Sequence, residues 1–163
     1  MKNKIKDPKQ FIESFLQIKT KEGKIVPFHL NESQEKLYQA MMRQRKEGKP
    51  IRILILKARQ MGFSTLTEGL IFHDCVTHFR HTAMIMAHKE EATQNLFQMS
   101  KLFYERLPEF LRPMRKSSNA KELLFENPTQ NAEEKEKFPG LQSKIKCTTA
   151  GGKGVGRSDT LTC

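Results

Sequence analysis

Cysteine is scarce in this sequence of 163 residues, and the three cysteines that occur are far apart. Cys75, Cys147 and Cys163 form no C-x-x-C pair, and their number is odd. This usage excludes a fold held together by a framework of disulfides and is typical of a protein in a reducing compartment. We therefore expect a fold that depends on a hydrophobic core rather than on covalent cross-links.

Paired metal ligands are also missing. Cys75 has three histidines near it in the sequence, His73, His78 and His81, which are residue types that bind zinc. Structural zinc sites use paired ligands, and no second cysteine pair accompanies this group. We interpret the histidines as structural, with a metal site as the alternative.

Long apolar runs are absent as well. The longest, residues 53–56, is far shorter than the roughly 20 residues that a membrane-spanning helix needs. The first nine residues are polar and basic, and no apolar segment follows them, so no secretory signal is visible. These observations predict a soluble, intracellular protein without a membrane partner.

Acidic residues are few relative to basic ones. The chain has 29 Lys and Arg against 18 Asp and Glu, which gives a formal charge of +11 and a pI near 9.7. Such a surplus favours a polyanionic partner such as nucleic acid, an anionic membrane or a nucleotide, and a merely basic surface is the alternative. The length suits one domain, and a hydrophobic content of 37% is enough for a core.

The hydrophobic pattern predicts an α/β fold. Residues 51–56 are rich in β-branched side chains and follow a proline, as in a buried central strand of a parallel sheet. Strands and helices then alternate, which favours a mostly parallel sheet, and residues 131–137 read as a polar loop. Helices are expected at 8–17, 32–46, 65–76 and 90–106, further strands at 82–87, 123–125 and 145–148, and an extended segment at 18–28.

The most informative segment is KARQMGFST, residues 57–65, between a predicted strand and a predicted helix. The usual phosphate-binding loop reads G-x-x-x-x-G-K-S/T, and Gly62 and Ser64 match its second glycine and its hydroxyl. A glycine lets the backbone wrap around phosphates, the helix N-terminus offers N–H groups, and the hydroxyl holds Mg²⁺. The segment therefore predicts a phosphate-binding loop.

Two positions depart from that pattern. Lys57 stands in place of the first glycine, and Phe63 stands in place of the lysine. Because such a loop closes around the phosphates, a lysine at its start can reach the same oxygens, and Arg59 adds a second cation. A basic turn between strand and helix is the alternative.

This loop resembles that of the large terminase subunits, the DNA-packaging ATPases of tailed phages. Their loop carries an R-Q-x-G core, which Arg59, Gln60 and Gly62 match. One branch of the family also has a lysine at the loop entrance and an aromatic residue at the lysine position, as Lys57 and Phe63 do here.

Three further segments resemble the same family in the same order. VPFHLNESQ, ending in Gln34, looks like its adenine-reading segment, and MIMAHK, ending in Lys89, looks like its segment that couples ATP to translocation. AGGKGVGR, ending in Arg157, resembles the glycine-rich run before the second acidic motif. Taken singly, each has a structural reading: a solvated helix residue, a surface lysine and a solubilising arginine.

The resemblance implies a three-layer, additional-strand (RecA-like) P-loop ATPase fold that binds ATP and Mg²⁺. Residues 1–50 would carry the N-terminal helix and the adenine-reading segment, and residues 51–163 part of the ATPase core. Arg157 would stabilise charge at a neighbouring subunit's ATP, and Lys89 would couple hydrolysis to movement. The implied ATP ligands are Gln34, Lys57, Arg59, Gln60, Gly62, Phe63, Ser64 and Thr65, with Ser64 also holding Mg²⁺.

The resemblance also implies partners: double-stranded DNA, a portal protein, a small terminase subunit and a ring of further copies on the procapsid, in the host cytoplasm. No apolar run ending in Asp-Glu occurs, and the nearest candidate, residues 123–126, precedes the glycine-rich run. We therefore expect a fragment without the catalytic acid or the nuclease domain, which binds ATP but hardly hydrolyses it. The alternatives are a helicase-like translocase and a non-catalytic remnant that binds nucleic acid or the portal.

Overall fold

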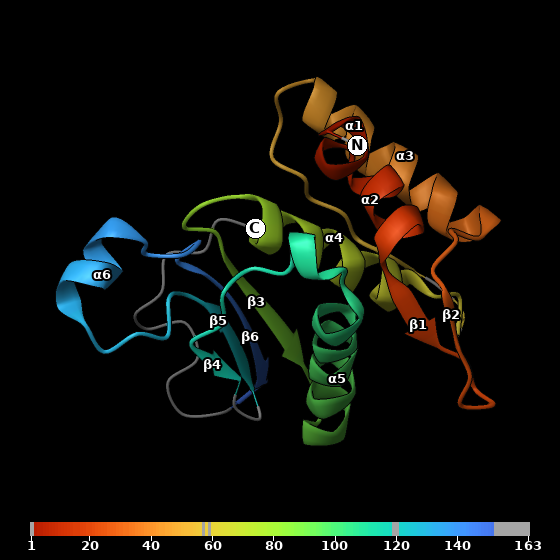
Figure 1. Ribbon diagram of the computed structural model, residues 1–163. Helices are drawn as coiled ribbons and strands as arrows, with labels where there is room; N and C mark the ends of the chain where they lie inside the picture. Colours follow the sequence, from red (N-terminus) through yellow and green to blue (C-terminus); the bar gives the residue numbers. More distant parts are fainter. Residues whose placement is uncertain (1, 57, 59, 119–120, 152–163) are drawn as a thin grey trace.

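The computed structural model describes residues 2–56, 58, 60–118 and 121–151 as a mixed α/β structure (Figure 1). A layer of helices packs on a small sheet, and one hydrophobic core lies between them. The elements are α1 (Lys2–Lys6), α2 (Pro8–Phe15), β1 (Gln17–Lys19), β2 (Ile25–Pro27), α3 (Glu32–Lys46), α4 (Phe63–Thr77), β3 (Thr82–Ala87), α5 (Glu90–Arg106), the 3₁₀ turn η1 (Glu109–Leu111), β4 (Ser117–Ser118), β5 (Glu122–Phe125), α6 (Ala132–Lys137) and β6 (Ser143–Thr149).

The main sheet has the order β3-β6-β5-β4 and is mixed. β3 and β6 run parallel, whereas β5 is antiparallel to both β6 and β4. The prediction of a mostly parallel sheet is therefore wrong for the strands described. β5 and β6 are joined by a connection that holds only the short helix α6, and neighbouring antiparallel strands do not need a crossover helix packed on the sheet.

One face of this sheet is buried and the other is partly open. Along β6 and β5 the side chains alternate between buried and half-buried, which is the pattern of a sheet covered on one face. α4 and α5 contact each other and both contact β3 and β6, so they cover the same face. A third layer is not seen among the described residues and stays a prediction.

The predicted central strand at residues 51–56 is the main correction. The segment is extended, but within the described residues it pairs with no strand. Ile53 and Ile55 are 36% and 39% exposed, whereas Leu54 and Leu56 are fully exposed. The sequence pattern indicates burial on both faces, but here the isoleucine face is only partly covered and the leucine face is open.

Helix α6 was not predicted, because it is short and polar and has no apolar face. Residues 131–137 are not a loop, because the carboxamide oxygen of Asn131 accepts the N–H groups of Glu133 and Glu134 and starts helix α6. The other predicted helices and strands are confirmed within a few residues, including the hairpin β1–β2 and the helices α2, α3, α4 and α5.

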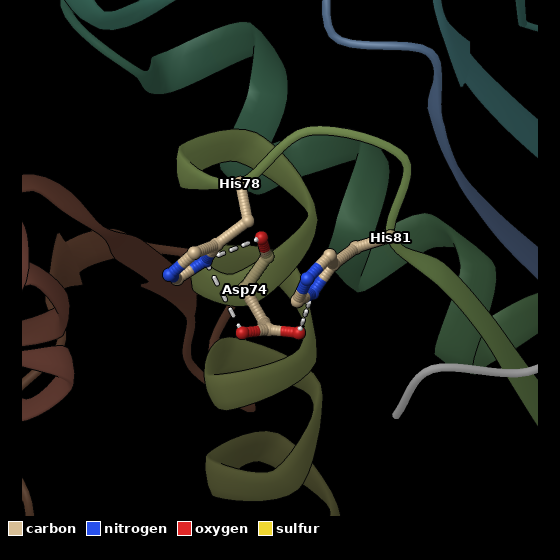
Figure 2. Close-up of side chains that lie close together, drawn as sticks. All are labelled: Asp74, His78 and His81. Carbon is tan, nitrogen blue, oxygen red and sulfur yellow. Dashed lines mark hydrogen bonds and ion pairs between the residues drawn. The ribbon is translucent and has the colours of Figure 1, made fainter.

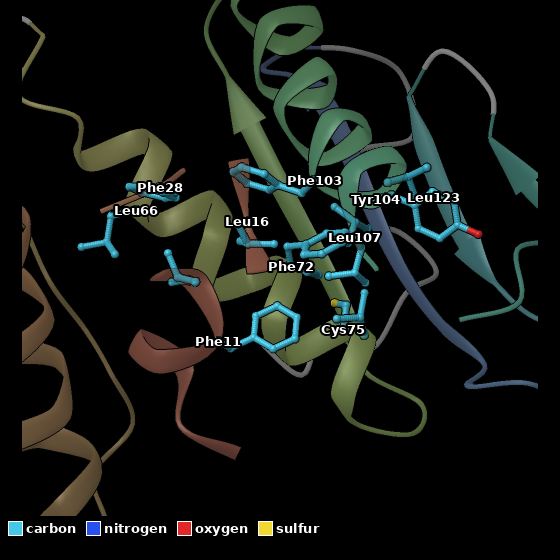
Figure 3. Close-up of a cluster of buried hydrophobic side chains, with 14 of the residues drawn as sticks. Phe11, Leu16, Phe28, Leu66, Phe72, Cys75, Phe103, Tyr104, Leu107 and Leu123 are labelled. Atoms are coloured by element: carbon cyan, nitrogen blue, oxygen red, sulfur yellow. The ribbon is translucent and has the colours of Figure 1, made fainter. Parts of the chain in front are cut away.

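The core is rich in aromatic side chains, as Figure 3 shows. Phe28 and Phe72 both pack on Phe103. The ring centroids of Phe28 and Phe72 lie 6.3 and 5.6 Å, respectively, from that of Phe103, and these contacts link the hairpin, α4 and α5. Phe125 extends the cluster to the sheet through Phe72. None of the helices described is long and apolar enough to cross a bilayer.

A carboxyl group lies inside this core. Glu68 of α4 is 1% exposed and accepts a hydrogen bond from the hydroxyl of Ser100 on α5. Burial raises the pKa of Glu68 to about 7. The hydrogen bond from Ser100 lowers this pKa, but by less than burial raises it. The nearby thiol of Cys147 has its pKa raised to about 12, by burial first and by the Glu68 charge second. The protonated form of Glu68 therefore predominates at pH values below about 7.

Stability should fall as pH rises through the range of this group. The pKa of Glu68 is higher in the folded chain than its ordinary value of 4.5, so the folded state binds the proton more tightly. The resulting stabilisation is complete below pH 4.5 and is lost as pH rises to about 7, a change on the order of 3 kcal/mol. Glu68→Gln should flatten this part of the curve and raise the free energy of unfolding at pH 8.

The measurement is urea unfolding of the chain at a series of pH values. Glu91→Gln serves as the control, because Glu91 is an exposed glutamate of α5. Equal pH dependence in the Glu68→Gln chain and the unmodified chain would show that the buried carboxyl is not the titrating group.

Candidate nucleotide-binding site

The predicted phosphate loop ends in a tight turn at the start of α4. Gln60 and Gly62 both adopt left-handed backbone conformations, with φ values of 64° and 75°. The first hydrogen bond of the helix runs from the N–H of Leu66 to the carbonyl of Gly62, and no side chain caps this end. The N–H groups of Phe63, Ser64 and Thr65 thus lack partners within the helix, which is the arrangement that attracts anions.

Gln34 fastens this turn to the start of α3. Its side-chain N–H donates to the carbonyl of Gly62 at 2.7 Å, and its side-chain oxygen accepts the backbone N–H of Asn31 at 2.9 Å. The Asn31 oxygen in turn accepts the backbone N–H of Gln34, which completes a capping box. Gln34 is only 4% exposed, so the loop is held at its C-terminal end by a buried amide.

Glycine is required at position 62 for two reasons. Its φ of 75° is strained for any residue with a side chain. A Cβ atom there would also lie 2.6 Å from the amide nitrogen of Gln34, which two hydrogen bonds keep in place. The turn and the capping box therefore constrain each other.

The first turn of α4 faces the C-terminal half of β3. Phe63 and Ser64 line a small cavity together with Ile55, Ile85 and Met86. Thr65 lies on another side of the helix and lines a separate cavity between α4 and α5. Ser64 is thus on the side of α4 that faces the C-terminal half of β3. On the outer side, Lys21 of the hairpin turn donates to the side chain of Gln60 at 2.5 Å.

Lys89 lies where β3 ends. It is the N-cap residue of α5 and is exposed, and its carbonyl accepts the N–H of Thr93. At the same edge of the sheet, the N–H of Ala150 donates to the carbonyl of Ala87 at 2.8 Å. Because β3 and β6 are parallel, Lys89 and the start of the glycine-rich segment lie at one edge of the sheet.

The structure thus brings together some of the predicted residues and leaves others open. Gln34 donates a hydrogen bond to Gly62. Gln60 lies before Gly62 in the same turn, and Phe63 and Ser64 follow it. Lys57, Arg59 and Arg157 lie outside the described residues. The contact between the start of α3 and this turn was not expected, although the spacing of Asn31 and Gln34 is a capping-box signal.

No family model matches this chain, and no curated protein matches its sequence.

Gly62→Ala should destabilise the chain more than Gly48→Ala. Both glycines have positive φ, 75° and 68°, so both substitutions carry a backbone strain of roughly 1–2 kcal/mol. Only at Gly62 does the new Cβ meet another atom, the Gln34 amide, whereas nothing lies within 4 Å of it at Gly48. Breaking the buried amide contact adds about 1–3 kcal/mol. Thermal or urea unfolding measures the difference, and equal losses would show that the Gln34 contact is not a constraint.

Proposed function

We propose that this chain is the ATP-binding part of a DNA-packaging motor of the large terminase kind. The observation that carries the proposal is the glycine turn at the N-terminus of α4, held by the buried amide of Gln34 with the Ser64 hydroxyl beside the end of β3. It supports a site for a phosphate group, since unpartnered helix N–H groups and the positive end of the helix dipole both favour an anion.

The chemistry of the site then follows from the residues in and around the turn. The N–H groups of Phe63, Ser64 and Thr65 bind phosphate oxygens, and the Ser64 hydroxyl holds Mg²⁺. Lys57 and Arg59 supply the positive charge that the usual motif takes from its lysine. Phe63 keeps its backbone role while its side chain packs beside Ile55 and Ile85.

Gln34 has two roles in this proposal. One N–H of its amide donates to the Gly62 carbonyl, and one lone pair of its oxygen accepts the Asn31 N–H. A primary amide has a second N–H and a second lone pair, which are the groups that read the edge of adenine. The same side chain would therefore position the phosphate turn and select the base.

The remaining roles concern force and partners. Lys89 couples the site to DNA movement from the edge of the sheet where β3 ends, and Arg157 acts on the ATP of a neighbouring copy in a ring. The surplus of positive charge suits the DNA backbone, and the portal protein and small terminase subunit complete the assembly in the host cytoplasm. A helicase-like translocase would use the same ATP chemistry, so the packaging role depends on the resemblance in four segments.

Lys57→Ala should weaken binding of ATP with Mg²⁺ by about 10- to 100-fold. The reason is the loss of one charge-assisted contact to phosphate, worth roughly 1.5–3 kcal/mol. Lys49→Ala is the matched control, because Lys49 lies before the extended segment and pairs with Glu47. Titration calorimetry measures both variants, and equal losses would contradict a phosphate contact by Lys57.

Gln34→Ala should lower the preference for ATP over GTP. Removing the amide also loosens the turn, so both nucleotides bind more weakly, but only ATP loses a contact to its base. The ratio of the two dissociation constants, measured in the unmodified and the substituted chain, separates the two effects. An unchanged ratio with reduced stability would leave Gln34 a purely structural role.

A further inference from the structure

A cluster of three metal-ligand side chains lies at the opposite end of α4 from the phosphate turn (Figure 2). Asp74 is in the last turn of the helix, His78 follows its end, and His81 immediately precedes β3. One Asp74 oxygen lies 3.3 Å from Nδ1 of His78, and the other lies 2.5 Å from Nδ1 of His81. The candidate ligand atoms of all three lie within 4.8 Å of one another.

The backbone holds these side chains together without help from a ligand. The hydroxyl of Ser143, which is fully buried, donates to the carbonyl of His78 at 2.7 Å and accepts the N–H of His81 at 3.0 Å. Arg80 adopts a left-handed conformation, with φ of 59°, and its N–H donates to the carbonyl of Leu141. The turn from helix to strand is thus fixed by β6 and the segment before it, so the two imidazoles are preorganised.

The two neighbouring ligand types are directed elsewhere. Cys75 is buried and its thiol lies against the carbonyls of His81 and Lys144, at 3.9 and 3.6 Å. Nε2 of His73 lies 2.8 Å from the carbonyl of Ile5. Cys75 and the three histidines, which are close in sequence, are therefore split in space, and the carboxylate of Asp74 contacts His78 and His81.

We propose that Asp74, His78 and His81 bind one Zn²⁺ or a similar transition-metal ion. One carboxylate and two imidazoles are a ligand set that suits Zn²⁺, whereas Ca²⁺ and Mg²⁺ prefer oxygen alone. The carboxylate lies between the imidazoles and supplies one negative charge to the cation. A metal with bonds of about 2.0–2.2 Å would lengthen the 2.5 Å contact between Asp74 and His81 and shorten the widest separation, which is at most 4.8 Å.

The proposed site has room for a fourth ligand. Asp74 and His81 line a cavity of about 600 Å³ between α4 and the N-terminal helices, whose wall also includes Arg45. The side chains of Asp74, His78 and His81 are 21%, 44% and 30% exposed, so the ion can enter from solvent. Three protein ligands with an open position would leave a water on the metal, on the side of this cavity.

The test is titration of the purified full chain with Zn²⁺, and with Co²⁺ as a spectroscopic probe, in the absence of nucleotide. A Cys163→Ser background removes one thiol that binds such ions by itself. We expect one equivalent to bind, with the visible absorption of Co²⁺ that is typical of nitrogen and oxygen ligands in a site of low coordination number. Asp74→Asn and His81→Ala should each weaken Zn²⁺ binding by more than the 10- to 100-fold that loss of an outer-shell partner causes.

His29→Ala and His88→Ala are the matched controls, because both histidines are exposed and lie outside the cluster. They should leave Zn²⁺ affinity unchanged. Circular dichroism checks folding, and Asp74→Asn, which keeps the shape of the side chain, replaces His81→Ala if that variant unfolds. Zn²⁺ should also raise the melting temperature of the unmodified chain but not of Asp74→Asn.

Two results would overturn the proposal. One is no Zn²⁺ binding by the unmodified chain, which would leave the cluster as a hydrogen-bonded end of α4. The other is an equal loss of affinity in the control variants, which would indicate general adsorption to surface histidines. Because the proposal does not involve ATP, neither result bears on the phosphate turn.

Discussion

The hydrogen bond from the Gln34 amide to the carbonyl of Gly62 joins two parts of the chain that are 28 residues apart. It ties the capping box of α3 to the start of α4. The Gln34 amide lies so close to Gly62 that no side chain fits there. Because the donor is buried and its oxygen is also bonded, leaving either group unpaired would cost more than the bond itself contributes. The position of the first turn of α4 depends on this contact.

α4 carries that constraint through the molecule. Its N-terminus is the turn at Gly62, its middle holds the buried Glu68, and its C-terminus carries Asp74, beside His78. The helix packs against α2, α5 and β6, so the aromatic core surrounds it on several sides. A displacement at one end of such a helix is transmitted along it because close-packed interiors deform little.

Much of the fold follows from sequence, and the exceptions have physical reasons. The helices α3 and α5 and the strand β3 were predicted from periodicity, because their apolar spacing has a single interpretation. α6 was missed because its stability comes from the Asn131 cap rather than from an apolar face. Strand direction in the sheet depends on contacts between β5 and β6, which no local pattern encodes.

The candidate sites show the same limit. Gly62 and Ser64 were found because the phosphate motif is local in sequence. The sequence groups Cys75 with the histidines and does not single out Asp74, because the direction of a side chain at the end of a helix depends on the turn that Ser143 fixes from another strand. Gln34 was predicted to read adenine, which stays a prediction, and its bond to Gly62 was not foreseen.

The segment at residues 51–56 favours association between copies of the chain. Leu54 and Leu56 are fully exposed, and exposed apolar side chains are a surface through which chains associate. The net charge of +11 opposes that association, because copies repel one another. Added salt screens this repulsion beyond about 10 Å at 0.1 M while leaving the apolar attraction in place. Ionic strength thereby sets the balance between dispersed and clustered chains.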